Sequence, residues 1–576
     1  MADGFPMIRI YLSFFPRCRI ALVFRLALCF IFLAASPTSA QAEAEKGEKG
    51  QNDAPATLRI DPLLIAEANE VWNLIGSQNN PIWPGWDASA TPLLFYLPGE
   101  QDVLVNHPHP PQGFRRYDGP VQFPGWRIYV KDGPTLIGID GQNTSKDVGG
   151  ERTLVVADTL SNMRQQVFGW VADPRPMQDK FQTFKYSDLA TDPYFQLSLV
   201  VHEAFHVYQD KMAPDKGADE WLLLYYPVLS VQNNVGFALE GSALADALHA
   251  TGDAEFRRAA LRWLALRKNR RSSLPPKAVE YEDGVEFTEG LAVYTEYRLF
   301  QVLEGRRPGA AMSWAQGFAG YANLAHQRED LVDQVVKHTS GAINVNNDPY
   351  GTAPLRMRLY YSGMAMGVLL DRLLPGWQSR IFAPDSSLTS LLEEALKPSA
   401  TDLEQALRGA RSGAAYAELL KNKTKLADDG KAHVEAMVKE IESGPGIGLI
   451  VDYSQLAVTK LGMGVTPFGI TVVDEERTIF TQIPIKVAFG QAGEVVQTAP
   501  TPLLRDTGRK IVRFRLPPGA TRAEVEKRLE SAAPRDGTIA DLALDLPGAT
   551  VKATKAQIKW SGDDLTIVML QSDKKE

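Results

Sequence analysis

The chain has 576 residues, two cysteines and a formal net charge of −8. An acidic chain without a basic stripe disfavours nucleic acid as a partner. Beyond the N-terminal segment, no apolar run reaches the roughly 20 residues that a membrane-spanning helix needs. The length is sufficient for two or three domains, each with a sizeable core.

Residues 1–40 have the pattern of a secretory signal peptide. Basic residues (Arg9, Arg17 and Arg19) precede an apolar segment over residues 20–35, and small residues around Ala40 offer a cleavage site. The apolar segment is too short to favour an uncleaved membrane anchor. Residues 41–56 are small and charged, without apolar periodicity, and we interpret them as a linker.

Export has two consequences for the mature chain. Both cysteines, Cys18 and Cys29, lie within the signal peptide, so neither disulfides nor thiolate ligands are available after cleavage. The first 40 residues carry four Arg and one Asp, so their removal lowers the net charge from −8 to −11. We expect a bacterial periplasmic or secreted protein with no membrane span after signal cleavage.

Residues 57–185 have the pattern of a mixed α/β N-terminal lobe. Apolar residues at helical spacing predict a helix over residues 61–75. Short β-prone runs separated by Pro and Gly predict strands at residues 92–97, 103–106, 126–130, 135–139 and 153–157.

Residues 186–444 have mainly helical periodicity. Apolar stripes predict helices over residues 228–250, 253–271, 284–304, 312–325, 358–374 and 387–396. The second of these carries seven basic residues between Arg257 and Arg271, which we interpret as a solvated helix face.

Residues 445–576 change to short β-branched runs between Gly and Pro clusters. They predict strands at residues 470–473, 478–487, 511–516 and 565–570, and a helix over residues 520–532. This pattern indicates a β-rich C-terminal module, and it contains no catalytic signature.

The strongest chemical signal lies in residues 194–211. Asp192 can cap this helix and Pro193 suits its first position, whereas Pro214 prevents it from continuing far beyond Met212. His202 and His206 are four residues apart, so their rings project from one helix face. Glu203 adjoins the first histidine. This His-Glu-x-x-His pattern is typical of two imidazole ligands to Zn²⁺ with a glutamate as general base.

A catalytic zinc needs a third protein ligand. The histidine of the extended three-histidine motif would stand at position 212, which is Met212. Two Glu-Gly-x-Ala segments compete instead. Glu240 is the one charged residue between Val228 and Ala245, so we expect it to be buried, where a carboxylate needs a partner. Glu289 shares a helix stripe with Glu286 and Glu296, which could simply face water. The physical argument slightly favours Glu240.

Residues 288–296 (TEGLAVYTE) resemble the Asn-Glu-Gly-Phe-Ala-x-Tyr-x-Glu segment of the M1-type aminopeptidases, which are gluzincin metallopeptidases. That resemblance implies a thermolysin-like α+β core with Glu289 as third zinc ligand. Tyr360 falls where the family has a tyrosine that binds the oxyanion, and Tyr361 is its neighbour. This chain lacks the segment Gly-x-Met-Glu-Asn, has Ser362 where the family has Lys, and separates His206 from Glu289 by a longer insertion.

Together, these patterns predict an exported peptidase with one zinc ion per chain. Glu203 would take a proton from a zinc-activated water that attacks the peptide carbonyl of a peptide or protein substrate, and Tyr360 would stabilise the oxyanion. Two alternatives are a non-catalytic zinc-binding scaffold and a binding protein of the cell envelope. The chain lacks the Gly-x-Ser-x-Gly motif of serine hydrolases and the phosphate-binding P-loop motif, which argues against those two classes.

Overall fold

The computed structural model describes residues 57–571 except 121–122, 124, 139–140, 160, 163–191, 316, 344–348, 458–460, 464–467, 482–483 and 533–536. The predicted signal peptide and linker lie outside the described residues. Within the described part, no helix is both long and apolar enough to cross a membrane. Helices and sheets are both abundant, so the chain belongs to the α+β class.

The chain divides into two compact units, each built from separate segments. Unit 1 comprises Met1–Asp215, Ala292–Leu331 and Gln378–Pro384, and unit 2 comprises Lys216–Leu291, Val332–Trp377 and Asp385–Glu576. The mainly helical segment over residues 186–444 contributes to both units.

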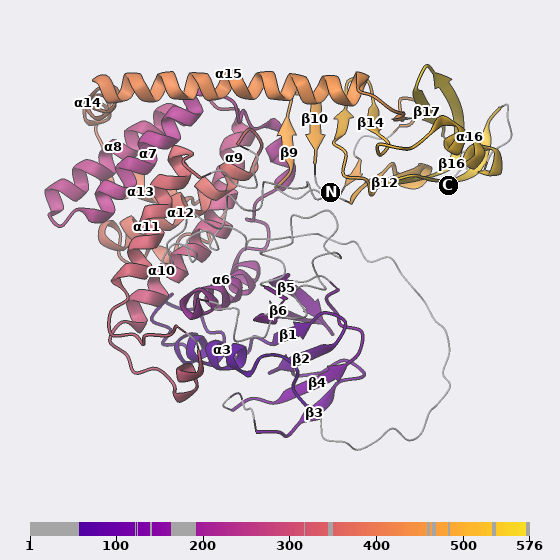
Figure 1. Ribbon diagram of the computed structural model, residues 1–576. Helices are drawn as coiled ribbons and strands as arrows, with labels where there is room; N and C mark the ends of the chain where they lie inside the picture. The colour runs from indigo at the N-terminus through magenta and orange to yellow at the C-terminus, as the bar shows by residue number, and fades with distance from the viewer. Residues whose placement is uncertain are drawn as a thin grey trace, which may run out of the picture. The chain divides into compact units, whose positions relative to one another are not determined.

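Unit 1 contains a six-stranded mixed sheet in the order β3-β4-β2-β1-β6-β5 (Figure 1). The strands are β1 (Leu93–Leu97), β2 (Gln101–Val105), β3 (Arg115–Tyr117), β4 (Ile128–Asp132), β5 (Thr144–Val148) and β6 (Glu151–Ala157). β1 pairs parallel with β6, and the other four strand pairs of the sheet are antiparallel. Four of the five predicted strands are present. The prediction of a strand at residues 135–139 is wrong, since residues 135–138 form none, and β3 and β5 were missed.

Helix α3 (Pro62–Ile75) begins as its sequence predicts. The Asp61 side chain accepts a hydrogen bond from the Leu63 amide at 2.9 Å, and Pro62 occupies the first helical position. The predicted apolar stripe is buried, and α3 packs against helix α6 (Pro193–Met212). Helix α6 also packs on β5 and β6, so the six-stranded sheet supports the helix that carries the His-Glu-x-x-His pattern.

A run of further helices lies between residues 220 and 443 (Figure 1). They are η3 (Glu220–Tyr225), α7 (Val231–His249), α8 (Asp253–Arg271), α9 (Pro276–Val285), the π-helix η4 (Glu286–Gly290), α10 (Leu291–Leu303), η5 (Ala310–Trp314), α11 (Ala325–Ser340), α12 (Ala353–Leu373), η7 (Trp377–Ser379), α13 (Leu388–Leu396), α14 (Ala400–Ala410) and α15 (Ala414–Ser443).

Two helix predictions in this region need correction. The prediction of a helix over residues 312–325 is wrong: a short 3-10 helix ends at Trp314, and α11 begins only at Ala325. Gly317 and Gly320 between them adopt positive φ angles of 82° and 80°, which an α-helix cannot contain. The predicted helix over residues 284–304 is divided by the π-helix η4, which the apolar pattern could not reveal.

The predicted β-rich segment forms an eleven-stranded sheet within unit 2, in the order β8-β11-β12-β16-β17-β7-β14-β13-β10-β9, with β15 paired to β16. Its strands are β7 (Gly448–Asp452), β8 (Gly462–Met463), β9 (Ile470–Val472), β10 (Arg477–Phe480), β11 (Ile485–Ala488), β12 (Gly493–Gln497), β13 (Leu503–Asp506), β14 (Ile511–Arg515), β15 (Ile539–Leu546), β16 (Ala549–Ser561) and β17 (Asp564–Met569). The single strand predicted at residues 478–487 is two strands, and the predicted helix is α16 (Arg522–Ala532).

The C-terminal end of α15 is attached to this sheet. Val438 and Ile441 pack with Ile479 and Leu504 of the sheet. The guanidinium of Arg513 donates to the carbonyl of Ile441 at 3.1 Å. Arg515, also on β14, donates to the carbonyls of Ile441 and Glu442. Cations at the last carbonyls of a helix stabilise its C-terminus.

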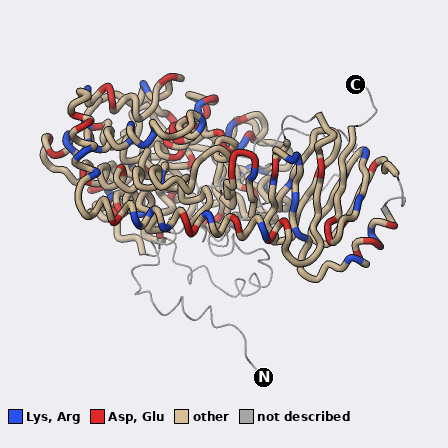
Figure 2. The backbone as a smooth tube through the Cα atoms, turned by 90° about the horizontal axis from the view of Figure 1, so that it is seen from above, with Lys and Arg blue, Asp and Glu red and all other residues tan. Residues whose placement is uncertain are grey.

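The basic run of α8 is only partly a solvated face, which corrects our interpretation: Arg257, Arg258 and Lys268 are exposed, but two other arginines are buried. Arg267 and Arg270 are 0% and 2% exposed. Arg267 bonds to Glu286, and Arg270 bonds to Glu240 and Glu282, all of which are buried. The acidic partners lie on α7, α9 and η4, so the spacing within α8 could not indicate them. Figure 2 shows acidic and basic residues interspersed along the helices and strands.

Candidate metal centre

Helix α6 presents the two histidines as its sequence predicts. The Asp192 side chain caps the helix through the Tyr194 amide at 3.0 Å, and the helix ends at Met212. The rings of His202 and His206 have centroids 4.8 Å apart and stand nearly perpendicular. Both histidines and Glu203 are 4% exposed, so all three polar side chains are buried.

His202, His206 and Glu289 come together as a potential metal-binding group. Each offers one ligand atom, and these atoms lie within 4.8 Å of one another. All three side chains are buried. Two imidazoles and one carboxylate form a donor set known from catalytic zinc sites, which keep a fourth position for water or substrate. A buried His-His-Glu group of this kind can bind a metal ion.

The second ring nitrogen of each histidine contacts a side-chain oxygen. Nδ1 of His202 lies 2.8 Å from Oε1 of Glu296, and Nδ1 of His206 lies 2.9 Å from Oε1 of Gln209. A proton on Nδ1 satisfies each contact and places the lone pair on Nε2. Such outer contacts orient imidazole ligands and fix their tautomer in metal sites.

Glu289 lies in the π-helix η4, a feature that is rare and frequently found at functional sites. The turn is held against α12 by a close backbone approach. A Cβ atom added to Gly290 would lie 2.6 Å from the Cα atom of Gly363. Neither position therefore has room for a side chain. The alternative that Glu289 faces water is wrong, because its exposure is 4%.

A buried ion-pair chain holds the Glu289 carboxylate. Arg356 of α12 donates from Nη2 to Oε1 of Glu289 at 2.9 Å, and its Nη1 bonds to Glu220. Tyr281 donates to Glu220 at 3.1 Å. Burial by itself lowers the pKa of Arg356, but the Glu220 carboxylate, two tyrosines and Glu289 raise that pKa well above its ordinary value. Arg356 therefore stays charged between two carboxylates.

Glu240, the competing third ligand, is buried as expected but is engaged elsewhere. Nε of Arg270 donates to its Oε1 at 2.5 Å, and Nη2 of the same arginine donates to its Oε2 at 3.2 Å. Arg267 lies 3.5 Å from the second oxygen. These ion pairs provide the partner that the burial of Glu240 requires.

Tyr360 and Tyr361 occupy different surroundings on α12. Tyr360 is 1% exposed, and the guanidinium carbon of Arg356 lies 5.6 Å from its ring centroid. Tyr361 stacks on the ring of His338 at a centroid distance of 4.8 Å. Arg356 thus contacts both Glu289 and the tyrosine that the family resemblance indicates.

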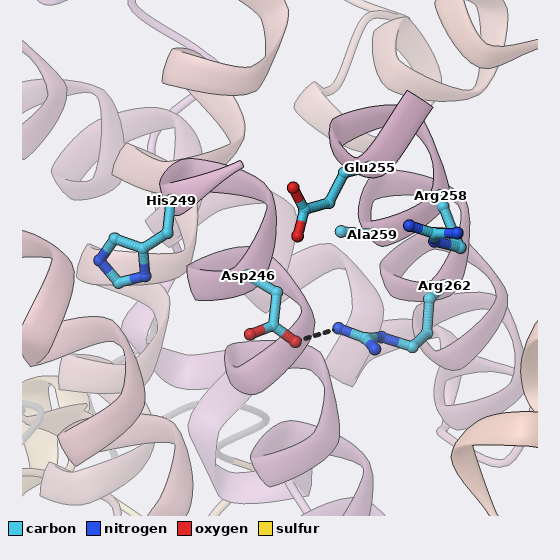
Figure 3. Close-up of a pocket in the computed structure, with 6 residues that line it drawn as sticks. All are labelled: Asp246, His249, Glu255, Arg258, Ala259 and Arg262. Atoms are coloured by element: carbon cyan, nitrogen blue, oxygen red, sulfur yellow. Dashed lines mark hydrogen bonds and ion pairs between the residues drawn. The ribbon is translucent and has the colours of Figure 1, made fainter. Parts of the chain in front are cut away.

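A separate pocket of about 310 Å³ lies on α7 and α8 (Figure 3). Its lining side chains have mixed charge, and Asp246 bonds to Arg262 across it. The residues that line it are Asp246, His249, Glu255, Arg258, Ala259 and Arg262. None of the candidate metal ligands contributes to this pocket, so it is distinct from the centre described above.

Sequence reasoning missed three residues that support the candidate centre. Gln209 contacts His206 from one helix turn further along α6. Its side chain is only 3% exposed, which is unusual for a glutamine and is not visible in the sequence. Arg356 and Glu220 lie 67 and 69 residues from Glu289, so no local pattern connects them. Glu296 formed part of the resembling segment, but its contact with His202 could not be read from that segment.

Comparisons with known proteins give no match. No family model matches the chain, and no curated protein or solved structure is significantly similar to it.

Proposed function

We propose that this protein is an exported zinc-dependent peptidase of the gluzincin type, with a thermolysin-like catalytic core. One observation carries the proposal: a His-Glu-x-x-His helix and a distant glutamate supply three buried ligand atoms within 4.8 Å of one another. The donor set suits zinc, the bound ion would activate a water molecule as a Lewis acid, and one ion per chain would fill the group.

Each residue of the candidate site has a separate role in the proposed reaction. His202, His206 and Glu289 would hold the ion, and Glu296 and Gln209 would orient the two imidazoles. Glu203 accepts a proton as the water attacks the peptide carbonyl and transfers it to the leaving amine. Glu203 is buried and adjoins His202 on the same helix, which supports this role.

Tyr360 serves as the donor to the developing oxyanion. Its position in α12, one turn after Arg356, and the resemblance to gluzincins support this role. Removal of one oxyanion donor costs about 10²–10³ in kcat in comparable sites. The substrate is a peptide or protein in the periplasm or outside the cell, in keeping with the signal peptide predicted over residues 1–40.

The test of this function is Glu203→Gln assayed on a library of peptides. The variant removes the basic carboxylate but keeps its size and hydrogen-bonding capacity. Zinc content is expected to remain at one ion per chain while hydrolysis falls to background. Undiminished hydrolysis would contradict the role of Glu203. Zinc binding by wild type without cleavage of any peptide would favour the non-catalytic scaffold, and wild type without zinc would favour a binding protein.

A further inference from the structure

Two buried cations of unit 2 differ from their neighbours in having no acidic partner. Arg358 of α12 is 5% exposed and Lys423 of α15 is 8% exposed. Among the residues that the structure describes, no carboxylate lies within ion-pair distance of either group. By contrast, Arg267, Arg270 and Arg356 each bond to at least one buried glutamate.

The contacts of Arg358 satisfy only part of its guanidinium. Nη1 donates to Oδ1 of Asn234 at 2.7 Å, and the group lies 5.3 Å from the ring centroid of Phe237. Nε is buried and has no hydrogen-bond partner within the described part of the chain. A buried charge with unsatisfied donors is costly. Desolvation and the nearby Arg270 accordingly lower the pKa of Arg358 to about 10, so it remains charged at neutral pH.

Lys423 faces the same small region as Arg358. Its ammonium donates to the carbonyl of Ser340 at the end of α11, which occupies one of its three donors. A Cβ atom on the next residue, Gly341, would lie 3.3 Å from Nζ of Lys423 and 3.7 Å from Nη2 of Arg358. Two like charges thus converge on one glycine. Burial and Arg358 together lower the pKa of Lys423 to about 8.

His338, one turn before Gly341, supplies a third polar group. It is 1% exposed, its ring stacks on Tyr361, and its Nε2 has no hydrogen-bond partner among the described residues. Burial and the adjacent Arg358 lower the pKa of His338 to about 3, so the ring is neutral and can donate from Nε2.

We infer that Arg358, Lys423 and His338 form a binding site for one small oxyanion, of the phosphate or carboxylate type. The Nε and Nη2 edge of a guanidinium matches two oxygens of such an anion, and an ammonium adds a point charge. An oxyanion would neutralise the repulsion between Arg358 and Lys423 and satisfy their remaining donors. The site belongs to α11, α12 and α15 and uses none of the candidate metal ligands.

The test compares wild type with Lys423→Met and Lys421→Met. Methionine keeps the length of the lysine side chain without its charge. Lys421 lies two residues earlier on α15 with its side chain 78% exposed, so Lys421→Met is a matched control. The thermal unfolding midpoint is measured against inorganic phosphate, and separately against acetate, with ionic strength held constant with sodium chloride.

We expect a saturable rise of the midpoint in wild type and in Lys421→Met, because a ligand that binds only the folded state stabilises it. Lys423→Met should bind the anion at least tenfold more weakly. The anion that gives a saturable rise of the midpoint, phosphate or acetate, identifies the class of oxyanion. Equal responses in Lys423→Met and wild type would overturn the inference, and so would the absence of a saturable response to both anions in wild type.

Discussion

Nη2 of Arg356 donates to Oε1 of Glu289 at 2.9 Å, although both side chains are at least nine-tenths buried. The same arginine bonds to Glu220, so one cation compensates two buried carboxylates. The pair therefore explains how Glu289 can be buried as an ion, and it fixes the carboxylate that is our candidate third ligand. Removal of a single partner from such a group leaves uncompensated charge.

Arg356→Met should therefore destabilise the fold by about 3–5 kcal/mol. Urea-induced unfolding measures this difference. Arg372→Met is the control on the same helix, because Arg372 pairs with Asp253 at the surface and such pairs contribute about 1 kcal/mol or less. Equal losses in the two variants would show that the Glu220–Arg356–Glu289 chain contributes no more than a surface pair.

Glu296→Ala should weaken zinc binding about 10–100-fold, because it removes the oxygen that contacts Nδ1 of His202. Glu296→Gln keeps an acceptor oxygen, so its zinc affinity should be closer to that of wild type. Competition with a chelator measures both affinities. Identical affinities in Glu296→Ala and wild type would exclude an orienting role for this contact.

Gly363→Ala should destabilise unit 2 by about 1–3 kcal/mol, because a methyl group at this position would lie 2.6 Å from the Cα atom of Gly290. Gly409→Ala on α14 is the control, since no atom lies within 4 Å of its added Cβ. That variant should be unchanged or stabilised by up to about 1 kcal/mol. A neutral Gly363→Ala would mean that the two backbones do not approach so closely.

The buried His338 should make stability depend on pH below neutrality. Its pKa in the folded state is about 3, below the ordinary value of 6.5. The unfolded chain therefore binds the proton more tightly, and the stabilisation present above pH 6.5 is lost as pH falls towards 3. From pH 7.5 to 5.5, the loss from this residue amounts to about 1 kcal/mol.

His338→Phe retains a ring to stack on Tyr361 and should remove that part of the pH dependence. His326→Phe on the same helix is the control, since the His326 side chain is 81% exposed. Unfolding free energies of both variants and wild type, in buffer without phosphate or carboxylate, provide the comparison. If the unfolding free energy of His338→Phe depended on pH as strongly as that of wild type, a neutral buried His338 would be contradicted.

Local signals predicted the helix that carries the histidines. Asp192, Pro193 and the position of His202 and His206 on one face depend on residues within one helix, so spacing alone was sufficient. The strands of unit 1 were mostly predictable for the same reason. The order of both sheets was not, because pairings such as β1 with β6 join segments some 60 residues apart.

The third ligand of the candidate metal centre could not be identified from residue spacing. Glu240 and Glu289 are both buried, so burial could not distinguish them. The difference lies in the partners: Arg267 and Arg270 of α8 bind Glu240, and sequence had assigned that basic run to solvent. The π-helix that contains Glu289 packs against α12 and has no signature in the apolar pattern of the sequence.

Zinc content of purified wild type, Glu289→Ala and Glu240→Gln tests the central claim most directly. Glu240→Gln keeps an oxygen that can accept a hydrogen bond from Arg270. We therefore expect this variant to fold, so that its zinc content can be compared with that of wild type. We predict one zinc per chain in wild type and in Glu240→Gln, and loss of zinc in Glu289→Ala. A wild type without zinc, or zinc retained in Glu289→Ala and lost in Glu240→Gln, would contradict the proposed metal centre.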